Sequence, residues 1–225
     1  MHFIANKYLH EQFIIPSLSN YGKVIPLRDE IKDPNKLITW TEENFSYVRY
    51  NPSKDIDRYG LSVTSLDGGL SGYPDLDSLT EYNFKMGNLD TNGSFVKEQD
   101  MNVPTPVYEY PELKELCDEW TPDLFRTHIL KINPGGYFPP HRDHTNTNLE
   151  SLRLLMPLLN CSPTGLTFII DNEIINWKHG TLYFVDTAKM HYLFNPSFEP
   201  SYMLVMNIAV NKKTVQTIID KFQYR

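Results

Sequence analysis

The tetrapeptide Pro140-His141-Arg142-Asp143 contains the residues best suited to bind a metal ion. If the segment is a strand, side chains two positions apart point to the same side, so His141 and Asp143 project together. An imidazole and a carboxylate on one face can occupy adjacent positions of a divalent metal. A third ligand must come from elsewhere, and His191 is the best candidate because the strands predicted between it and His141 can fold back.

Two histidines and one carboxylate leave several metal positions open. Such a ligand set suits a non-haem Fe(II) that binds a cosubstrate and O₂ together, whereas a closed four-ligand site is typical of a structural metal. His-x-Asp alone is a weak pattern, but a Gly-rich turn and strand-like runs surround it here. We therefore predict that His141, Asp143 and His191 are the metal ligands and form the catalytic centre.

Short apolar runs recur along the second half of the chain. They lie at residues 125–132, 151–159, 165–170, 173–177, 181–186, 190–194 and 202–210. Turn residues separate them, and Asp171-Asn172 predicts a tight hairpin. Many short strands at close spacing are typical of a β-sandwich or barrel. We expect a mainly β fold, an eight-strand jelly-roll or cupin-like barrel (a double-stranded β-helix), over residues 120–210.

Outside this barrel the pattern of apolar and turn residues is less regular. Residues 1–119 mix short apolar runs with turn residues, which predicts an irregular α+β arm covering the barrel. A strand is expected within 36–50, and a helix over 111–120. Residues 211–225 have apolar side chains at helical spacing and predict a closing helix. The length of 225 residues fits one domain, 1–225.

The segment from Arg58 to Gly69 is rich in small and hydrogen-bonding residues. One interpretation is a lid or specificity loop, because substrate contacts in such barrels come from the arm and the loops at the barrel mouth. The other is a well-packed surface meander. The residues alone leave both open.

Composition narrows the function classes. Hydrophobic residues at 40% and charged residues at 22% are ordinary for a globular protein. The net charge of −7 lacks the basic field that attracts nucleic-acid phosphates, so a nucleic-acid partner is not expected. Without a signal-peptide pattern or a long apolar run, we expect no membrane partner and a cytoplasmic location.

In their order and spacing, these motifs resemble those of the Fe(II)/2-oxoglutarate-dependent oxygenases. Within them the chain is most similar to the aspartyl/asparaginyl β-hydroxylase-like branch, which includes free-proline hydroxylases. The resemblance covers about residues 125–210. It is carried by the runs 127–132, 140–143, 152–158, 180–186 and 203–208, together with His191.

The resemblance implies Fe(II) as the metal, and 2-oxoglutarate and O₂ as cosubstrates. It implies that 2-oxoglutarate is decarboxylated to succinate and CO₂ while an unactivated C–H bond becomes C–OH. The implied substrate is an amino-acid unit, with aspartyl, asparaginyl and prolyl side chains as the leading cases, free or in a polypeptide. The loop 145–148 is expected to line the same pocket.

The far carboxylate of 2-oxoglutarate needs a basic anchor, ideally a bidentate arginine. In the family this residue often lies about ten positions after the second histidine, where this chain has Ser201. Arg153 is the best replacement, because a charge within an apolar strand must be paired. The alternative for Arg153 is a structural ion pair. Lys131 is the second candidate, and Arg126 is the third.

Two other functions stay open. One is a different mononuclear metalloenzyme on a cupin-like barrel, an isomerase or hydrolase using Zn²⁺ or Mn²⁺, which the missing arginine favours. It predicts no 2-oxoglutarate binding and activity without O₂. The other is a binding protein that keeps the barrel without turnover, and the intact triad argues against it.

Overall fold

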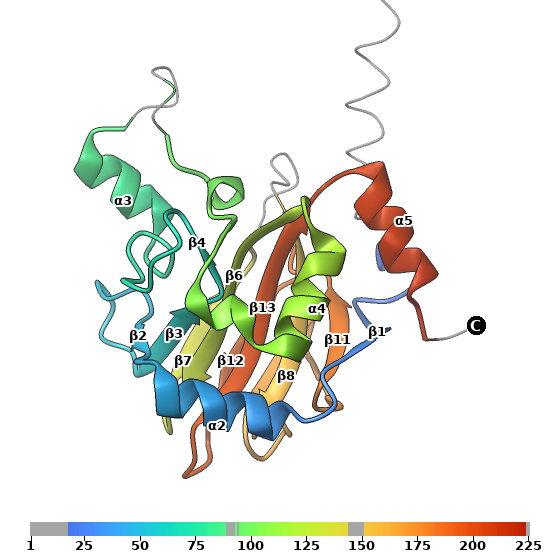
Figure 1. Cartoon of the computed structure of the whole chain (residues 1–225). Coiled ribbons are helices and arrows are strands. Elements are labelled where there is room, and N and C mark those ends of the chain that lie inside the picture. The colour runs from blue at the N-terminus through green and yellow to red at the C-terminus, as the bar shows by residue number, and fades with distance from the viewer. Residues whose placement is uncertain (1–17, 89–92, 94, 144–150, 224–225) are drawn as a thin grey trace, which may run out of the picture.

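Two antiparallel sheets form the body of the structure (Figure 1). The computed structural model describes residues 18–88, 93, 95–143 and 151–223. The larger sheet has the strand order β1-β11-β8-β13-β6-β3-β2, and the smaller has the order β10-β9-β12-β7. The larger sheet contains β1 (Val24–Glu30), β2 (Val48–Arg49), β3 (Arg58–Ser62), β6 (Leu124–Ile132), β8 (Ser151–Leu159), β11 (Thr181–Val185) and β13 (Ser201–Ala209). The smaller contains β7 (Tyr137–His141), β9 (Thr167–Ile170), β10 (Glu173–Ile174) and β12 (His191–Phe194).

The chain alternates between the two sheets from β6 to β13. The strands β6, β8, β11 and β13 lie in the larger sheet, and the strands that follow each of the first three lie in the smaller one. This alternation is that of a jelly roll, and it confirms the predicted fold class. Asp171 and Asn172 have φ angles of 52° and 64° and join β9 to β10, as a tight hairpin requires. The extent of the single domain stays a prediction.

Helices cover the outer face of the larger sheet. Figure 1 shows α2 (Pro34–Asn44) and α4 (Pro111–Trp120) crossing this face, with α5 (Lys212–Asp220) at one end. Their apolar side chains pack with those of β6, β8, β11 and β13 into one buried cluster. The arm contains the remaining described α-helix, α3 (Leu79–Met86). It also contains the short paired strands β4 (Thr64–Ser65) and β5 (Val103–Pro104).

A second apolar cluster fills the space between the two sheets. It joins Leu130, Ile132 and Met203 of the larger sheet to Phe168 and Leu193 of the smaller one. The larger sheet is therefore buried on both faces, which explains why its strands appear in the sequence as continuous apolar runs rather than alternating ones.

The arm differs from prediction at α2. The strand expected within 36–50, ending at Tyr47–Tyr50, is present there only as the short β2, because residues 34–44 form the helix α2. Asp33 caps the helix by accepting a hydrogen bond from the Lys36 amide at 3.0 Å, and Pro34 suits the first turn. Buried Leu37 and Ile38 then face the sheet. The helix predicted over 111–120 is confirmed as α4, and the closing helix as α5.

The segment from Arg58 to Gly69 contributes a strand rather than a lid. Its first five residues form β3, which pairs with β6 along the edge of the jelly roll. Ser62 to Ser65 are also buried. The segment therefore belongs to the wall of the barrel, and its side chains can reach the interior. Among the described helices, none has the length and apolar character needed to cross a membrane.

We expect Gly180→Ala to lower the free energy of unfolding by about 3 kcal/mol, because the residue has φ +76° and a Cβ would lie 2.3 Å from the Ile31 carbonyl oxygen. Gly87→Ala is the matched control, since Gly87 has a similar φ of +67° but no atom within 4 Å of its Cβ position. Its expected cost is about 1 kcal/mol. Urea unfolding of both variants measures the difference, and equal losses would contradict the contact at Ile31.

Candidate active site

The structure brings His141, Asp143 and His191 together. His141 is the last residue of β7 and lies directly opposite His191, the first residue of β12, with 4.2 Å between the ring centroids. Asp143 follows the end of β7 instead of lying within the strand, and its amide donates to the Thr187 carbonyl at 3.1 Å. One possible ligand atom from each of the three residues lies within 4.8 Å of the others.

Backbone carbonyls orient both imidazoles. Nδ1 of His141 lies 2.7 Å from the Pro139 carbonyl oxygen, and Nδ1 of His191 lies 3.0 Å from that of Lys189. A carbonyl only accepts, so each Nδ1 carries the hydrogen and each Nε2 is left with a lone pair. The two Nε2 atoms lie 3.3 Å and 3.7 Å from Oδ1 of Asp143. Two imidazole nitrogens and a carboxylate oxygen thus converge, a donor set that fits Fe(II).

Arg153 holds the other oxygen of the same carboxylate. From β8, its Nε and Nη2 donate to Oδ2 of Asp143 at 3.2 Å and 2.9 Å. Burial raises the pKa of Asp143, but the Arg153 guanidinium, together with His141 and His191, holds that pKa well below its usual range. Asp143 is therefore ionised at neutral pH, with Oδ2 occupied by Arg153 and Oδ1 turned to the histidines.

The pKa values of the two histidines are shifted in opposite directions. Burial lowers the pKa of His141, but the protonated imidazole can donate from Nε2 to Asp143 and from Nδ1 to the Pro139 carbonyl, and with the charge of Asp143 these interactions together raise the net pKa. For His191 burial dominates over the charge of Asp143, and the pKa is lowered. His191 is accordingly neutral near pH 7 and ready to bind a metal, whereas a metal at His141 competes with a proton.

A cavity of about 320 Å³ opens beside these three residues between the two sheets. Seven apolar side chains line part of its wall: Leu130, Phe138, Leu155, Phe168, Leu193, Met203 and Val205. Four cationic side chains also line it: Lys54, Arg58, Arg126 and Arg153. The volume is at the lower end of the range of small-molecule sites, so the cavity accommodates compact ligands. The cationic side chains in its wall favour anionic ones.

Two of the lining arginines are paired with carboxylates. Arg126 on β6 pairs with Glu98 of the arm, and Glu98 also accepts a hydrogen bond from Ser151 at 2.9 Å. Burial raises the pKa of Glu98, but Arg126, Arg153 and the Ser151 hydroxyl together outweigh burial and the net pKa is lowered. With Arg153 and Asp143, this makes two neutral pairs. The third lining arginine, Arg58, has no carboxylate partner among the described residues.

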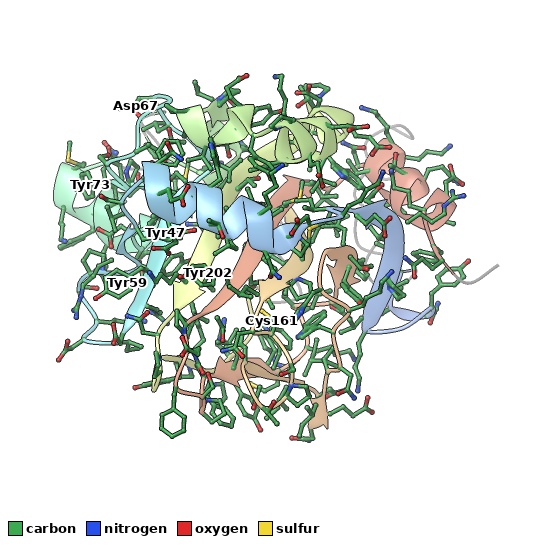
Figure 2. All side chains as sticks on the ribbon, turned by 60° about the horizontal axis from the view of Figure 1, so that its bottom comes forward. Tyr47, Tyr59, Asp67, Tyr73, Cys161 and Tyr202 are labelled. Carbon is green, nitrogen blue, oxygen red and sulfur yellow. The ribbon has the colours of Figure 1, made fainter. Side chains whose placement is uncertain are left out.

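The residues expected to bind the cosubstrate have different places. Nζ of Lys131 lies 2.9 Å from Glu42 on the outer face of the sheet, over the rings of Tyr47 and Tyr202. Figure 2 shows these two tyrosines next to each other beside α2. Ser201 is buried and donates to the Asn160 carbonyl at 2.8 Å. Neither residue lines the cavity.

Arg153 does line the cavity, and its ion pair is with Asp143 itself. The structural ion pair considered from the sequence is therefore present, and its partner belongs to the predicted metal site. The loop 145–148, predicted to line the pocket, lies outside the described residues.

Sequence reasoning missed Arg58. Its side chain lines the cavity and is 1% exposed. The available signal was an arginine directly before the run Tyr59-Gly60-Leu61-Ser62-Val63, which is a plausible strand. Nothing in the local sequence indicates that this strand pairs with β6, and only that pairing brings Arg58 to the site.

His128 lies in the cavity wall and is buried, and no described residue is a hydrogen-bond partner for its Nδ1. Burial lowers its pKa well below 6.5, and Arg126 and Arg153 lower it further. As the pH falls below about 6.5, the unfolded chain therefore binds a proton that the folded chain does not. We expect stability to fall with the pH from that point, and His128→Gln to reduce the slope by up to about 1.4 kcal/mol per pH unit. Urea unfolding between pH 7.5 and pH 5 with a metal chelator tests this, and an unchanged slope would contradict it.

Comparison with known proteins defines the class. A family model described as aspartyl/asparaginyl β-hydroxylase matches residues 84–210, more than half of the chain. The chain therefore belongs to the aspartyl/asparaginyl β-hydroxylase family, as its motifs predicted. A search of curated proteins finds no match.

Two solved structures are similar to most of the chain at low sequence identity. One is an oxidoreductase of the 2OG-Fe(II) oxygenase family from Burkholderia pseudomallei, 11% identical, covering 91% of this chain and 90% of its own, with a TM-score of 0.47. Another is the viral collagen prolyl hydroxylase of Paramecium Bursaria Chlorella virus-1, 10% identical, covering 86% of this chain and 99% of its own, with a TM-score of 0.45.

Membership of this family makes the protein a 2-oxoglutarate-dependent hydroxylase. Its cofactor is Fe(II), and its cosubstrates are 2-oxoglutarate and O₂. The converging nitrogen and oxygen atoms of the His-Asp-His cluster are of the kind that Fe(II) binds with open positions remaining.

Proposed function

We propose that His141, Asp143 and His191 hold the Fe(II) and that the enzyme hydroxylates a C–H bond of an amino-acid unit. Aspartyl, asparaginyl and prolyl side chains are the leading substrates, free or in a polypeptide. The observation that carries the proposal is the cluster itself, in which both Nε2 lone pairs and one carboxylate oxygen face a common point beside the cavity. The family description supports the substrate class.

The chain's own residues prepare the site for this chemistry. When bound, Fe(II) and 2-oxoglutarate supply the O₂-dependent oxidation of a C–H bond to C–OH. The carbonyls of Pro139 and Lys189 fix the imidazole planes, and Arg153 fixes the carboxylate, so the ligands are preorganised. The apolar wall around Leu155, Phe168 and Val205 excludes water from the reacting C–H bond.

The substrate's polar groups would meet Arg126, His128 and Arg153, which all line the cavity. An amino-acid unit offers carbonyl and carboxylate acceptors for such donors. Holding it there places one C–H bond near the metal, which is the positioning that the reaction needs. Buried Cys117 and Cys161 are both free thiols, which supports a reducing compartment, and we propose the cytoplasm.

An anaerobic titration of the Fe(II)-loaded protein with 2-oxoglutarate tests the proposal. We expect the visible metal-to-ligand charge-transfer band of a chelated 2-oxo acid, and its loss in His191→Ala. Incubation with O₂ and free or peptide-bound aspartate, asparagine or proline should then yield succinate and a product heavier by one oxygen atom. Fe(II) binding without the band would contradict the proposal and favour a metalloenzyme that needs no 2-oxo acid.

A further inference from the structure

Arg58 is a buried cation without a counter-ion among the described residues. It is 1% exposed, its Nη1 donates to the Tyr137 carbonyl at 3.3 Å, and its Nε has no hydrogen-bond partner in the part of the chain that the structure describes. Burial lowers its pKa, yet a guanidinium stays charged in proteins. A buried, unpaired charge is costly, so a site of this kind calls for an anion.

Arg58 also lines the cavity. The central carbon of its guanidinium lies 3.9 Å from the ring centroid of Phe138 and 5.5 Å from that of Tyr50, and all three residues line the cavity wall. These contacts hold the planar group in place without using its remaining donors. A ligand carboxylate could therefore meet a preorganised fork of N–H groups.

The strand register relates Arg58 to the position where the family often has its arginine. Ile132 on β6 lies opposite Ser201 on one side and opposite Arg58 on the other. Residues opposite each other on neighbouring strands point to the same face, so all three lie in one row facing the interior. The next row, Tyr59, Lys131 and Tyr202, points outward, and Figure 2 shows Tyr59 and Tyr202 there.

The distance to the metal site suits the cosubstrate. The Phe138 ring lies 6.2 Å from the His141 ring, centroid to centroid, so the Arg58 guanidinium carbon is at most about 10 Å from that imidazole. An extended five-carbon diacid separates its carboxylate carbons by about 5 Å, given C–C bonds of about 1.5 Å. Its metal-binding end and an ion pair at its far end together span such a gap.

Building on the proposed function, we propose that Arg58 binds the far carboxylate of 2-oxoglutarate. The arginine comes from the arm strand β3 and takes the place of the one missing at Ser201. Arg153 and Arg126 already neutralise Asp143 and Glu98, which leaves Arg58 as the buried arginine whose charge matches that of the ligand. Arg58 is thus a specificity-determining residue for the 2-oxo acid.

The test compares 2-oxoglutarate with 2-oxopentanoate, which has the same carbon chain but no far carboxylate. Both are titrated anaerobically into the Fe(II)-loaded protein, with the charge-transfer band as the readout. We expect the wild type to prefer 2-oxoglutarate by about 100-fold or more, and Arg58→Met to bind both acids equally weakly. Arg49→Met, on the neighbouring strand β2 and with an exposed side chain, is the matched control and should keep the preference.

Binding of Fe(II) alone should be unchanged in Arg58→Met, which shows that the barrel is intact. Arg58→Lys keeps the buried charge and serves if the methionine variant does not fold. It should weaken 2-oxoglutarate about tenfold and leave 2-oxopentanoate unchanged. A preserved preference in Arg58→Met, or equal losses for both acids in Arg58→Lys, would overturn the inference. If the wild type shows a band with neither acid, the proposed function itself fails.

Discussion

His141→Ala is expected to reduce hydroxylation by about 1,000-fold or more, because it removes one of three metal ligands and with it several kcal/mol of metal-dependent stabilisation of the transition state. The side chain is partly exposed at the end of β7, so its loss should change the free energy of unfolding by less than about 1 kcal/mol. Succinate formation measures the activity, Fe(II) titration measures the affinity for the metal, and urea unfolding measures the stability. His179→Ala is the control, because that imidazole accepts from the Cys161 amide and does not line the cavity.

Asp143→Ala should lose activity to the same degree but cost more stability. It strips the partner from the buried Arg153, and breaking a buried ion pair from one side costs about 3 kcal/mol or more. The contrast between the two variants separates ligation from folding. Full activity in either variant would show that the triad does not bind the catalytic metal.

Local patterns were sufficient to predict the barrel. The runs that became β6, β8 and β13 are apolar throughout because the larger sheet is buried on both faces. The hairpin at Asp171-Asn172 needs two residues that tolerate positive φ, which the sequence shows directly. His141 and His191 were paired correctly in space because strand order in a jelly roll follows from the number of runs between them.

The arm was harder to predict because its structure depends on distant partners. The sequence of α2 has few apolar residues, and the helix is stabilised by burying Leu37, Ile38 and Thr41 against the sheet. Arg58 reaches the site only because β3 pairs with β6, and β6 lies about seventy residues further along the chain. Lys131, by contrast, has the wrong parity, since it alternates with Leu130 and Ile132 and so points away from the cavity.

Arg153→Met is expected to weaken Fe(II) binding by 10- to 100-fold, the usual range for a residue that orients a metal ligand. Without the guanidinium, Oδ2 of Asp143 loses two donors and the carboxylate is free to rotate. The pKa of Asp143 should also rise toward its usual value, so a proton competes with the metal at higher pH than in the wild type. Fe(II) affinity measured from pH 5 to pH 8 should therefore fall earlier on acidification in the variant.

The pH dependence of the stability distinguishes the loss of this ion pair from a mere loss of packing in Arg153→Met. In the wild type the depressed pKa of Asp143 adds stability that is present above about pH 4 and is lost as the pH falls below that value. Arg153→Met should reduce this loss of stability at acidic pH, and Arg153→Lys should restore part of the wild-type pH dependence. If Arg153 instead bound the far carboxylate of 2-oxoglutarate, its loss would weaken 2-oxoglutarate and leave Fe(II) affinity unchanged. The expected pattern is the reverse, with Arg58→Met affecting the 2-oxo acid and Arg153→Met affecting the metal.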